Sequence, residues 1–143
     1  MSKLVLTFGS FDLLHPGHLS YLESARKHGD KLLVVISRDE SIKVIKGKTP
    51  LFNERDRLKM LKALKVVDYA IIGKKLKTPE DRYKIIKKYK PAVLAFGYDQ
   101  NVNEDEVRRW LKNNNIRSEI VRIKPYKKDK YKSSIIKKIL KIE

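Results

Sequence analysis

The sequence has 143 residues, the usual size of one domain, so we expect a single domain over residues 1–143. It carries 34 Lys and Arg residues against 17 Asp and Glu, a formal net charge of +17, which favours a partner or substrate of negative charge. The absence of cysteine excludes disulfides, zinc–thiolate sites and thiol catalysis. The apolar run in MSKLVLTFGSFD is too short for a signal peptide or a membrane-spanning helix, so we expect a cytoplasmic protein with no membrane partner.

The first half of the chain alternates short apolar runs with stretches of helical period. Residues 3–8 (KLVLTF) and 31–37 (KLLVVIS) are predicted strands, and the near-continuous apolar character of the second is typical of a strand covered on both faces. Between them we expect a helix over residues 16–28, with Gly29 as its C-terminal stop. Residues 39–53 are predicted to form a loop.

The same alternation continues through the second half. Asn53 is placed to cap a helix that runs to about Leu64, and the residues that follow, 66–73 (VVDYAIIG), read as a strand. Pro79 is expected to open a helix that ends before Pro91. The remaining predicted elements are strands at 92–97 (AVLAFG) and 118–123 (SEIVRI), a helix at 104–113, and a last helix starting near Ser133.

This order of elements predicts an α/β fold with one Rossmann-like, doubly wound, parallel five-stranded sheet, helices on both faces and strand order 3-2-1-4-5. No linker, repeat or low-complexity segment indicates a domain boundary. In such sheets ligands bind beyond the carboxyl ends of the strands, where the strand order reverses. We therefore expect the site at residues 9–18 (GSFDLLHPGH) and 97–100 (GYDQ), which follow the first and fourth strands.

Residues 15–18 read His-Pro-Gly-His and contain two of the chain's three histidines. Pro16 suits the first position of a helix, so His15 and His18 should lie one turn apart, beside the free N–H groups of the first turn. Gly17 should leave the backbone open to a ligand that approaches closely. Two imidazoles, open N–H groups and the positive end of a helix dipole are typical of an anion site, here for phosphate.

Other interpretations of the histidine pair are weaker. A purely structural role is less favoured for a pair that directly follows the first strand, and a zinc pair lacks a third ligand, since His28 lies at the far end of the same helix. A phosphate-binding Walker loop is excluded because Ile42 stands where its first glycine belongs. The three-glycine dinucleotide fingerprint is absent after the first strand, where only Gly9 and Gly17 occur.

The stretch GSFDLLHPGH resembles the HxGH signature of the nucleotidyltransferase superfamily, and residues 7–40 are similar to the cytidylyltransferase-like family along their whole length. Residues 44–68 (VIKGKTPLFNERDRLKMLKALKVVD) resemble the family's lysine loop and following helix, and residues 96–100 (FGYDQ) its Gly-x-Asp element. Residues 118–139 (SEIVRIKPYKKDKYKSSIIKKI) are most similar to the C-terminal end of archaeal FAD synthases, which are FMN adenylyltransferases.

The resemblance implies transfer of AMP from ATP to FMN, giving FAD and pyrophosphate, with a divalent metal ion that we expect to be Mg²⁺. A phosphate oxygen of the acceptor would attack the α-phosphorus of the nucleotide. The resemblance implies four catalytic residues: His15 and His18, which would stabilise charge on the transferring group, Lys46, and Asp12, which would orient the site or help to hold the metal.

The resemblance also implies two groups of binding residues. Lys46, Lys48 and Arg57 would bind the phosphate or the acceptor. The nucleotide would be bound by Ser10, Phe11, His15, Pro16, Gly17, His18, Asp99, Tyr126, Ser133 and Ser134.

Several of these residues also allow a purely structural role. Arg57 has the spacing of an i,i+3 partner of Glu54, and Asp99 suits a turn. Tyr126 would cover the edge of the sheet, and Ser133 would cap a helix. Trp110, the only tryptophan, is expected to pack under its helix rather than in a flavin pocket.

Two departures from the family pattern keep alternatives open. Ile135 stands where related enzymes often continue the hydroxyl-rich element with threonine, and residues 129–132 (DKYK) stand where archaeal FAD synthases often carry cysteines. The first alternative is a glycerol-3-phosphate cytidylyltransferase or another CTP- or ATP-dependent nucleotidyltransferase that acts on an alcohol or sugar phosphate. A basic nucleic-acid-binding protein is the alternative from a different class, although we expect only weak, non-specific binding of nucleic acid. A homodimer is expected.

Overall fold

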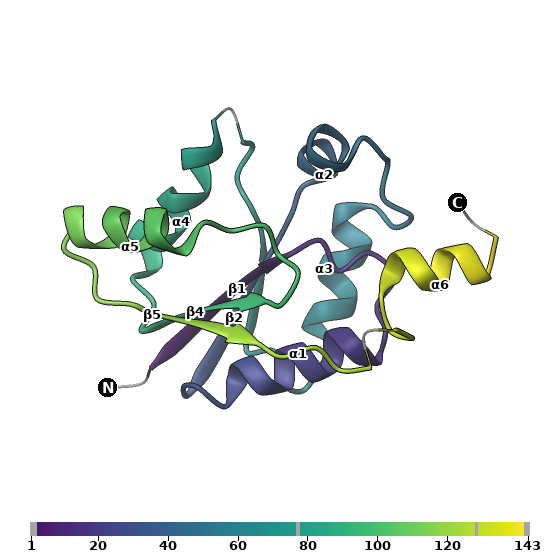
Figure 1. The fold of residues 1–143 in the computed structure, drawn as a ribbon, viewed down its shortest axis with the longest axis horizontal. Coiled ribbons are helices and arrows are strands. Elements are labelled where there is room, and N and C mark those ends of the chain that lie inside the picture. The colour runs from purple at the N-terminus through teal and green to yellow at the C-terminus, as the bar shows by residue number, and fades with distance from the viewer. Residues whose placement is uncertain (1–2, 77, 128, 142–143) are drawn as a thin grey trace.

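The computed structural model describes residues 3–76, 78–127 and 129–141 and contains a parallel five-stranded sheet with helices on both sides (Figure 1). The order β3-β2-β1-β4-β5, with every neighbouring pair parallel, confirms the predicted α/β class and strand order. The strands are β1 (Leu4–Gly9), β2 (Lys31–Ile36), β3 (Tyr69–Ile72), β4 (Val93–Gly97) and β5 (Glu119–Ile123).

Side chains of the central strands pack into two separate cores, one on each face of the sheet, because successive side chains point to opposite faces. Val5 and Val34 belong to the core under two helices, α1 (Pro16–Arg26) and α3 (Glu54–Lys62). The other core, under α4 (Tyr83–Tyr89) and α5 (Glu104–Asn113), contains Leu6 and Val35. Burial on both faces explains the continuous apolar character of these strands.

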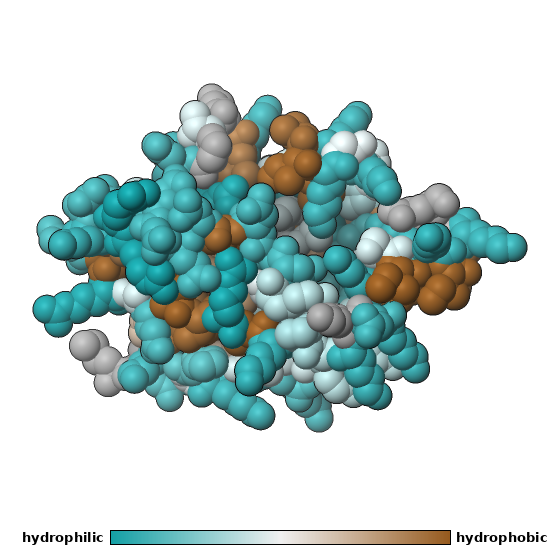
Figure 2. All heavy atoms as spheres, in the orientation of Figure 1, coloured by the Kyte–Doolittle hydropathy of each residue, from teal (hydrophilic) through white to brown (hydrophobic). Residues whose placement is uncertain are grey.

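The surface seen in Figure 2 is largely hydrophilic, as the charge of the chain predicts. A group of apolar side chains stands out at the end of α6 (Ser133–Ile139), where Ile139 and the adjoining Leu140 are 70% and 58% exposed. Within the described part of the chain, no helix has the length and apolar character needed to cross a membrane.

Residues predicted to lie in a loop form an additional helix, α2 (Asp39–Lys46). Only Ser41 and Ile42 of this helix are buried, and Arg38 at its N-cap makes no side-chain capping bond. Its sequence does carry helix signals, since acidic residues stand in the first turn and basic residues in the last, and Gly47 ends the helix in the left-handed conformation at φ 69°.

The predicted role of Gly29 is corrected by the structure. Helix α1 ends at Arg26 with Lys27 as its C-cap in a right-handed conformation, so Gly29 does not stop it. A Cβ atom at Gly29 would instead lie 2.6 Å from the carbonyl oxygen of Lys3. Glycine is needed there because the loop before β2 passes close to the start of β1.

The remaining helices lie close to their predicted positions. Asn53 caps α3, where its side chain accepts a hydrogen bond from the backbone N–H of Asp56. Trp110 packs under α5 as predicted, with its ring stacked 4.9 Å from that of Tyr83. Smaller differences are that α3 ends at Lys62, that β3 is shorter than the predicted strand, and that a 3₁₀ turn, η1 (Pro79–Arg82), precedes α4.

Candidate active site

A cleft of about 760 Å³ opens at the carboxyl ends of β1, β2 and β4, at the point where the strand order reverses. Pro16 and Arg57 do not line it. The other predicted site residues do, namely Ser10, Phe11, Asp12, His15, Gly17, His18, Lys46, Lys48, Asp99, Tyr126, Ser133 and Ser134.

The two signature imidazoles cap helix α1. His15 is the N-cap, and its Nδ1 accepts from the backbone N–H of Gly17 at 3.0 Å. The Nδ1 atom of His18 accepts from the backbone N–H of His15 at 3.2 Å, so the two side chains form a reciprocal capping box. The rings are stacked with their centroids 3.8 Å apart. The sequence predicts free N–H groups in the first turn, but those of His15 and Gly17 are already bonded, so a ligand would meet the outer edges of the imidazoles instead.

The same hydrogen bonds assign the protonation state of the pair. A nitrogen that accepts a hydrogen bond carries no proton, so the neutral form of each ring has its proton on Nε2. Burial lowers the pKa of His18 to about 3, with His15 and Lys46 acting in the same direction and Asp12 opposing them. Burial also lowers the pKa of His15. At neutral pH the site thus offers two uncharged Nε2–H donors.

Gly17 is required by the protein's own packing. A Cβ atom at this position would lie 2.7 Å from the His15 ring and 2.9 Å from the carbonyl oxygen of Tyr131. Any side chain here would separate the first turn of α1 from the C-terminal segment, which is the part of the chain that follows β5.

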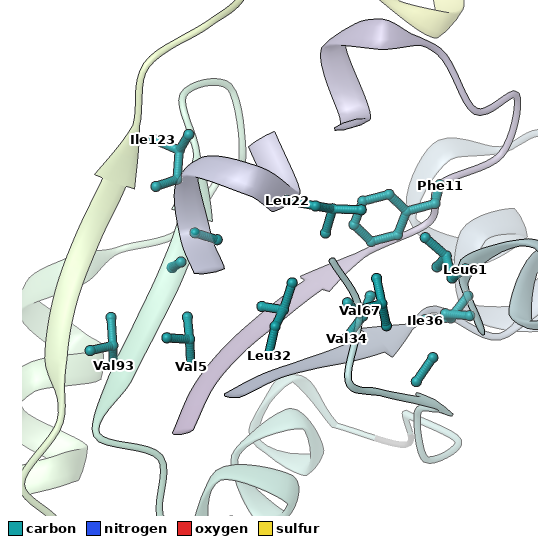
Figure 3. Packing of buried hydrophobic residues seen from close by; sticks show 13 residues of the cluster. Val5, Phe11, Leu22, Leu32, Val34, Ile36, Leu61, Val67, Val93 and Ile123 are labelled. Atoms are coloured by element: carbon teal, nitrogen blue, oxygen red, sulfur yellow. The ribbon is translucent and has the colours of Figure 1, made fainter. Parts of the chain in front are cut away.

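Phe11, the aromatic residue of the signature, packs against the ring of His18. Its buried ring stands edge-on to His18 at 5.4 Å and stacks on Tyr21 at 6.2 Å. Figure 3 shows the ring beside Leu22 in the core under α1. The hydroxyl of Tyr21 donates to the carbonyl oxygen of Ala95 in β4, so α1 is tied to the neighbouring strand at the site.

Asp12 holds two distant segments beside the cleft. Its carboxylate accepts hydrogen bonds from the backbone N–H groups of Leu51 and Phe52, at 2.7 and 2.8 Å. It also accepts one from Nζ of Lys137 in α6 at 2.6 Å. Burial acts to raise the pKa of Asp12, but these bonds outweigh burial and hold it below the ordinary value. The contacts are those of a residue that orients the site, which is one of the two roles predicted for it.

Arg57 does not have either of its predicted roles. Its guanidinium is fully buried and donates to the carboxylate of Asp39 at 2.6 Å, and to the carbonyl oxygens of Ser10 at 2.7 Å and Phe52 at 3.0 Å. It therefore does not face the cleft as a phosphate ligand or pair with Glu54 on the helix surface. Arg57 joins the signature loop, residues 10–15 between β1 and α1, to α2 and to the segment before α3.

A glutamine bridges the ends of the two strands that flank the switch point. The β1–β4 register runs from Val5↔Val93 to Thr7↔Ala95, and the strands then separate. Beyond that point, Nε2 of Gln100 donates to the carbonyl oxygen of Phe8 at 2.7 Å, while its Oε1 accepts from the N–H of Gly97 at 2.6 Å.

The loop after β4 is held by a second residue without a predicted role. Arg122 donates to the carbonyl oxygens of Gly97, Gln100 and Val102, and to the carboxylate of Glu104. The signal for Arg122 was a charged side chain between two apolar residues of β5, Val121 and Ile123. Gln100 lies in the element GYDQ, but no feature of the sequence indicated its bridging role.

The C-terminal segment lies over the first turn of α1. The rings of Tyr126 and Tyr131 stack at 5.9 Å, and Tyr131 in turn stacks at 6.2 Å on His15. Tyr126 therefore lies in an aromatic stack, and the structure gives no support to the alternative that it covers the sheet edge. Because Tyr131 stands in the stretch that departs from the family pattern, no sequence signal marked it.

The hydroxyl-rich element begins helix α6 on the wall of the cleft. Ser133 donates from Oγ to the carbonyl oxygen of Leu13 at 3.3 Å, while Lys132 is the N-cap, so the alternative of a Ser133 cap is wrong. Nζ of Lys132 lies 3.8 Å from the carboxylate of Asp99, and both side chains are about half exposed. Ser134 is exposed on the cleft wall.

The residues that line the cleft offer few ligands for a metal. Across residues 3–76, 78–127 and 129–141, no three His, Asp or Glu side chains are grouped so that they could hold an ion. Mg²⁺ fits such a site, because it commonly uses one or two carboxylates together with substrate phosphates rather than a cage of protein ligands. Asp12 lines the cleft, and its Oδ1 accepts a hydrogen bond from the backbone N–H of Phe52.

Residues 6–139 match the sequence model of the cytidylyltransferase-like family. Among curated relatives, the FAD synthase of Methanocella arvoryzae is 41% identical over 134 residues, which are 94% of this chain and 91% of that protein. The FAD synthase of Methanopyrus kandleri is 40% identical over 147 residues, covering 99% of this chain and 95% of that protein.

Solved structures give the same picture of the fold. A lipopolysaccharide core biosynthesis protein from Thermoplasma volcanium has a TM-score of 0.80 and 39% identity, covering 88% of this chain and 99% of that one. A pantoate-beta-alanine ligase from Francisella tularensis has a TM-score of 0.59 at 16% identity, over 99% of this chain and 70% of that one, and shows the fold alone.

The depressed pKa of His18 predicts a pH dependence of stability. The unfolded chain binds a proton at this residue below about pH 6.5, whereas the folded protein resists protonation down to about pH 3. The unfolded state then binds more protons, so the contribution of His18 to stability is present above pH 6.5 and is lost as the pH falls. Between pH 6.5 and 4.5, the free energy of unfolding of the parent should fall by about 2 kcal/mol more than that of His18→Gln. Urea unfolding at the two pH values measures this difference.

The matched control for this measurement is His28→Gln, which removes an exposed histidine. This variant should follow the parent at every pH. Equal pH slopes for the parent and His18→Gln would contradict the assignment of a neutral, buried imidazole.

The buried position of Arg57 predicts a loss of stability on substitution. Arg57→Met should lower the free energy of unfolding by about 3 kcal/mol, because the partners of the guanidinium lose their buried donors. The exposed neighbour Arg55, changed to Met, should alter stability by no more than about 0.5 kcal/mol. Urea unfolding followed by circular dichroism measures both. A variant Arg57→Met of parental stability with weakened binding of phosphorylated acceptors would restore the phosphate-binding role.

Proposed function

The chain belongs to the cytidylyltransferase-like family, and from that membership we propose that it transfers AMP from ATP to FMN, giving FAD and pyrophosphate. The observation that carries the proposal is the pair of neutral imidazoles with Nε2–H donors, His15 and His18, at the switch-point cleft. The archaeal FAD synthases that match nearly the whole chain support the choice of FMN and ATP.

The proposed reaction is an in-line displacement at the α-phosphorus of ATP. A phosphate oxygen of FMN forms the new bond to phosphorus while the bond to the β-phosphate oxygen breaks, and pyrophosphate leaves with that electron pair. FMN needs little help from a general base, because a phosphate monoester is already largely ionised at pH 7. His15 and His18 would donate from Nε2 to the oxygens of the α-phosphate, where charge is redistributed in the transition state.

The acceptor is assigned to the side of the cleft formed by α2. Lys46 ends this helix, Lys48 follows in the loop, and both are exposed, so their ammonium groups would attract the FMN phosphate. Ile45, which is 66% exposed, and Leu76 also line the cleft and add apolar surface suited to a flat ring system. The cleft volume of about 760 Å³ lies within the range of about 300–1,000 Å³ typical of small-molecule sites.

The nucleotide is assigned to the side formed by β4 and the C-terminal segment. Asp99 and Tyr126 would contact the nucleoside, and the hydroxyls of Ser133 and Ser134 would bind the β and γ phosphates. Ser10 and Phe11 would line the turn that faces the triphosphate. Mg²⁺, held by the phosphates with the aid of Asp12, would neutralise charge on the triphosphate.

Substrate tests distinguish this proposal from its alternatives. Purified protein with Mg²⁺ should form FAD and pyrophosphate from ATP and FMN, and His18→Ala should lower the rate by about 10²–10³-fold with its circular dichroism spectrum unchanged. Pyrophosphate release that requires CTP and glycerol 3-phosphate, with none from ATP and FMN, would identify the alternative cytidylyltransferase. A protein that binds nucleic acid tightly in a strongly salt-dependent way, and turns over none of these substrates, would belong to the other class.

We also propose that the protein is a homodimer and that it lies in the cytoplasm, where its proposed substrate ATP is available. The exposed apolar residues at the end of α6, Ile139 and Leu140, support the dimer because such residues favour burial against a partner. Light scattering after size exclusion should give twice the mass of the chain for the parent and a smaller mass for the double variant Ile139→Glu, Leu140→Glu. A monomeric parent at micromolar concentration would contradict the dimer.

A further inference from the structure

The contact between Asp12 and Lys137 joins three segments that are far apart in sequence. Asp12 lies in the signature loop, Lys137 in α6, and Leu51 and Phe52 just before α3. The ion pair is largely enclosed, since the side chains of Lys137 and Asp12 are only 15% and 8% exposed. An enclosed pair of this kind is screened much less by water and salt than a surface ion pair.

Helix α6 has few other anchors. None of its residues is buried. Within the part of the chain that the structure describes, its side chains reach other segments through a long hydrogen bond from Ser133 to Leu13 and a short one from Lys137 to Asp12. The position of this helix therefore depends strongly on the Asp12–Lys137 pair.

The loop that follows α2 depends on the same carboxylate. Residues 47–49 are exposed, and Asp12 holds the end of this loop by accepting hydrogen bonds from the N–H groups of Leu51 and Phe52. Lys48 belongs to this loop and Lys46 directly precedes it. A carboxylate that accepts two consecutive N–H groups must keep one orientation, and the ammonium of Lys137 fixes that orientation from the other side.

We propose that the Asp12–Lys137 pair couples the two sides of the cleft, so that a nucleotide bound at Ser133 and Ser134 raises the affinity for the phosphorylated acceptor at Lys46 and Lys48. The inference rests on the proposed function for the placement of the two substrates. Nucleotide binding fixes α6 and with it Lys137, which holds Asp12 and thereby orders the lysine loop before the acceptor arrives. The acceptor then loses less entropy on binding, and by linkage it raises nucleotide affinity by the same factor. Lys137 is a positioning residue in this scheme.

The first test measures the coupling directly. FMN binding is followed by flavin fluorescence with and without a saturating, non-hydrolysable α,β-methylene analogue of ATP. The parent should bind FMN at least about fivefold more tightly with the analogue, within the range usual for coupled sites. Lys137→Met should bring this factor close to one, and Lys137→Arg should restore most of it.

The control is Lys138→Met, which removes an exposed lysine from the next position of the same helix. It should keep the parental coupling factor. A parent with a factor of one overturns the proposal. So does a Lys137→Met protein that keeps the factor but binds the analogue alone tenfold more weakly, because Lys137 would then be a phosphate ligand.

The second test needs only the nucleotide and so separates this inference from the choice of FMN as acceptor. Hydrogen exchange at the amides of Leu51 and Phe52 should slow when the ATP analogue, or CTP if that is the nucleotide bound, is added to the parent. The change should be absent in Lys137→Met and present in Lys138→Met. Slowing that persists in Lys137→Met overturns the coupling even if FAD is formed. Slowing that is lost in Lys137→Met supports it even if FMN proves not to be the acceptor.

Discussion

The capping of helix α1 by two imidazoles is the interaction on which the rest of the site depends. Because the Nδ1 atoms of His15 and His18 accept backbone N–H groups, each ring has a fixed tautomer and a fixed direction. Burial keeps His18 neutral, so its outer nitrogen stays a donor over the whole physiological pH range. One set of hydrogen bonds thus begins the helix and orients the groups that a phosphate would meet.

The supports of this cap come from segments that are distant in sequence. Tyr21 ties α1 to β4, and Gln100 joins the ends of β1 and β4 where their ladder stops. Tyr131 covers the outer face of His15, at a distance that only glycine at position 17 allows. A switch point leaves strand ends without partners, and here side chains supply the missing bonds, which makes the cleft a defined site.

The sequence predicted what depends on local pattern. The strand order follows from alternating elements and crossover handedness, and HPGH combines a proline, a glycine and two histidines in one helical turn. It did not predict α2, whose eight residues bury little surface. It also could not separate Arg57, buried against Asp39, from a solvated lysine or arginine, or pair Asp12 with Lys137 across 125 residues. Such contacts are fixed by tertiary packing, for which neither residue carries a local signal.

The pairing of particular lysines with carboxylates changes what the net charge of +17 means for the site. Asp12 and Asp99 line a cleft proposed to take up two phosphorylated substrates, and unpaired carboxylates there would repel both. Each faces a lysine of the C-terminal segment, Lys137 for Asp12 and Lys132 for Asp99. The charge of these lysines offsets that of the carboxylates, so it does not add to the attraction of phosphorylated ligands. Attraction for phosphate is then left to groups such as Lys46 and to the uncharged imidazole donors, which are specific in direction because they are few and fixed.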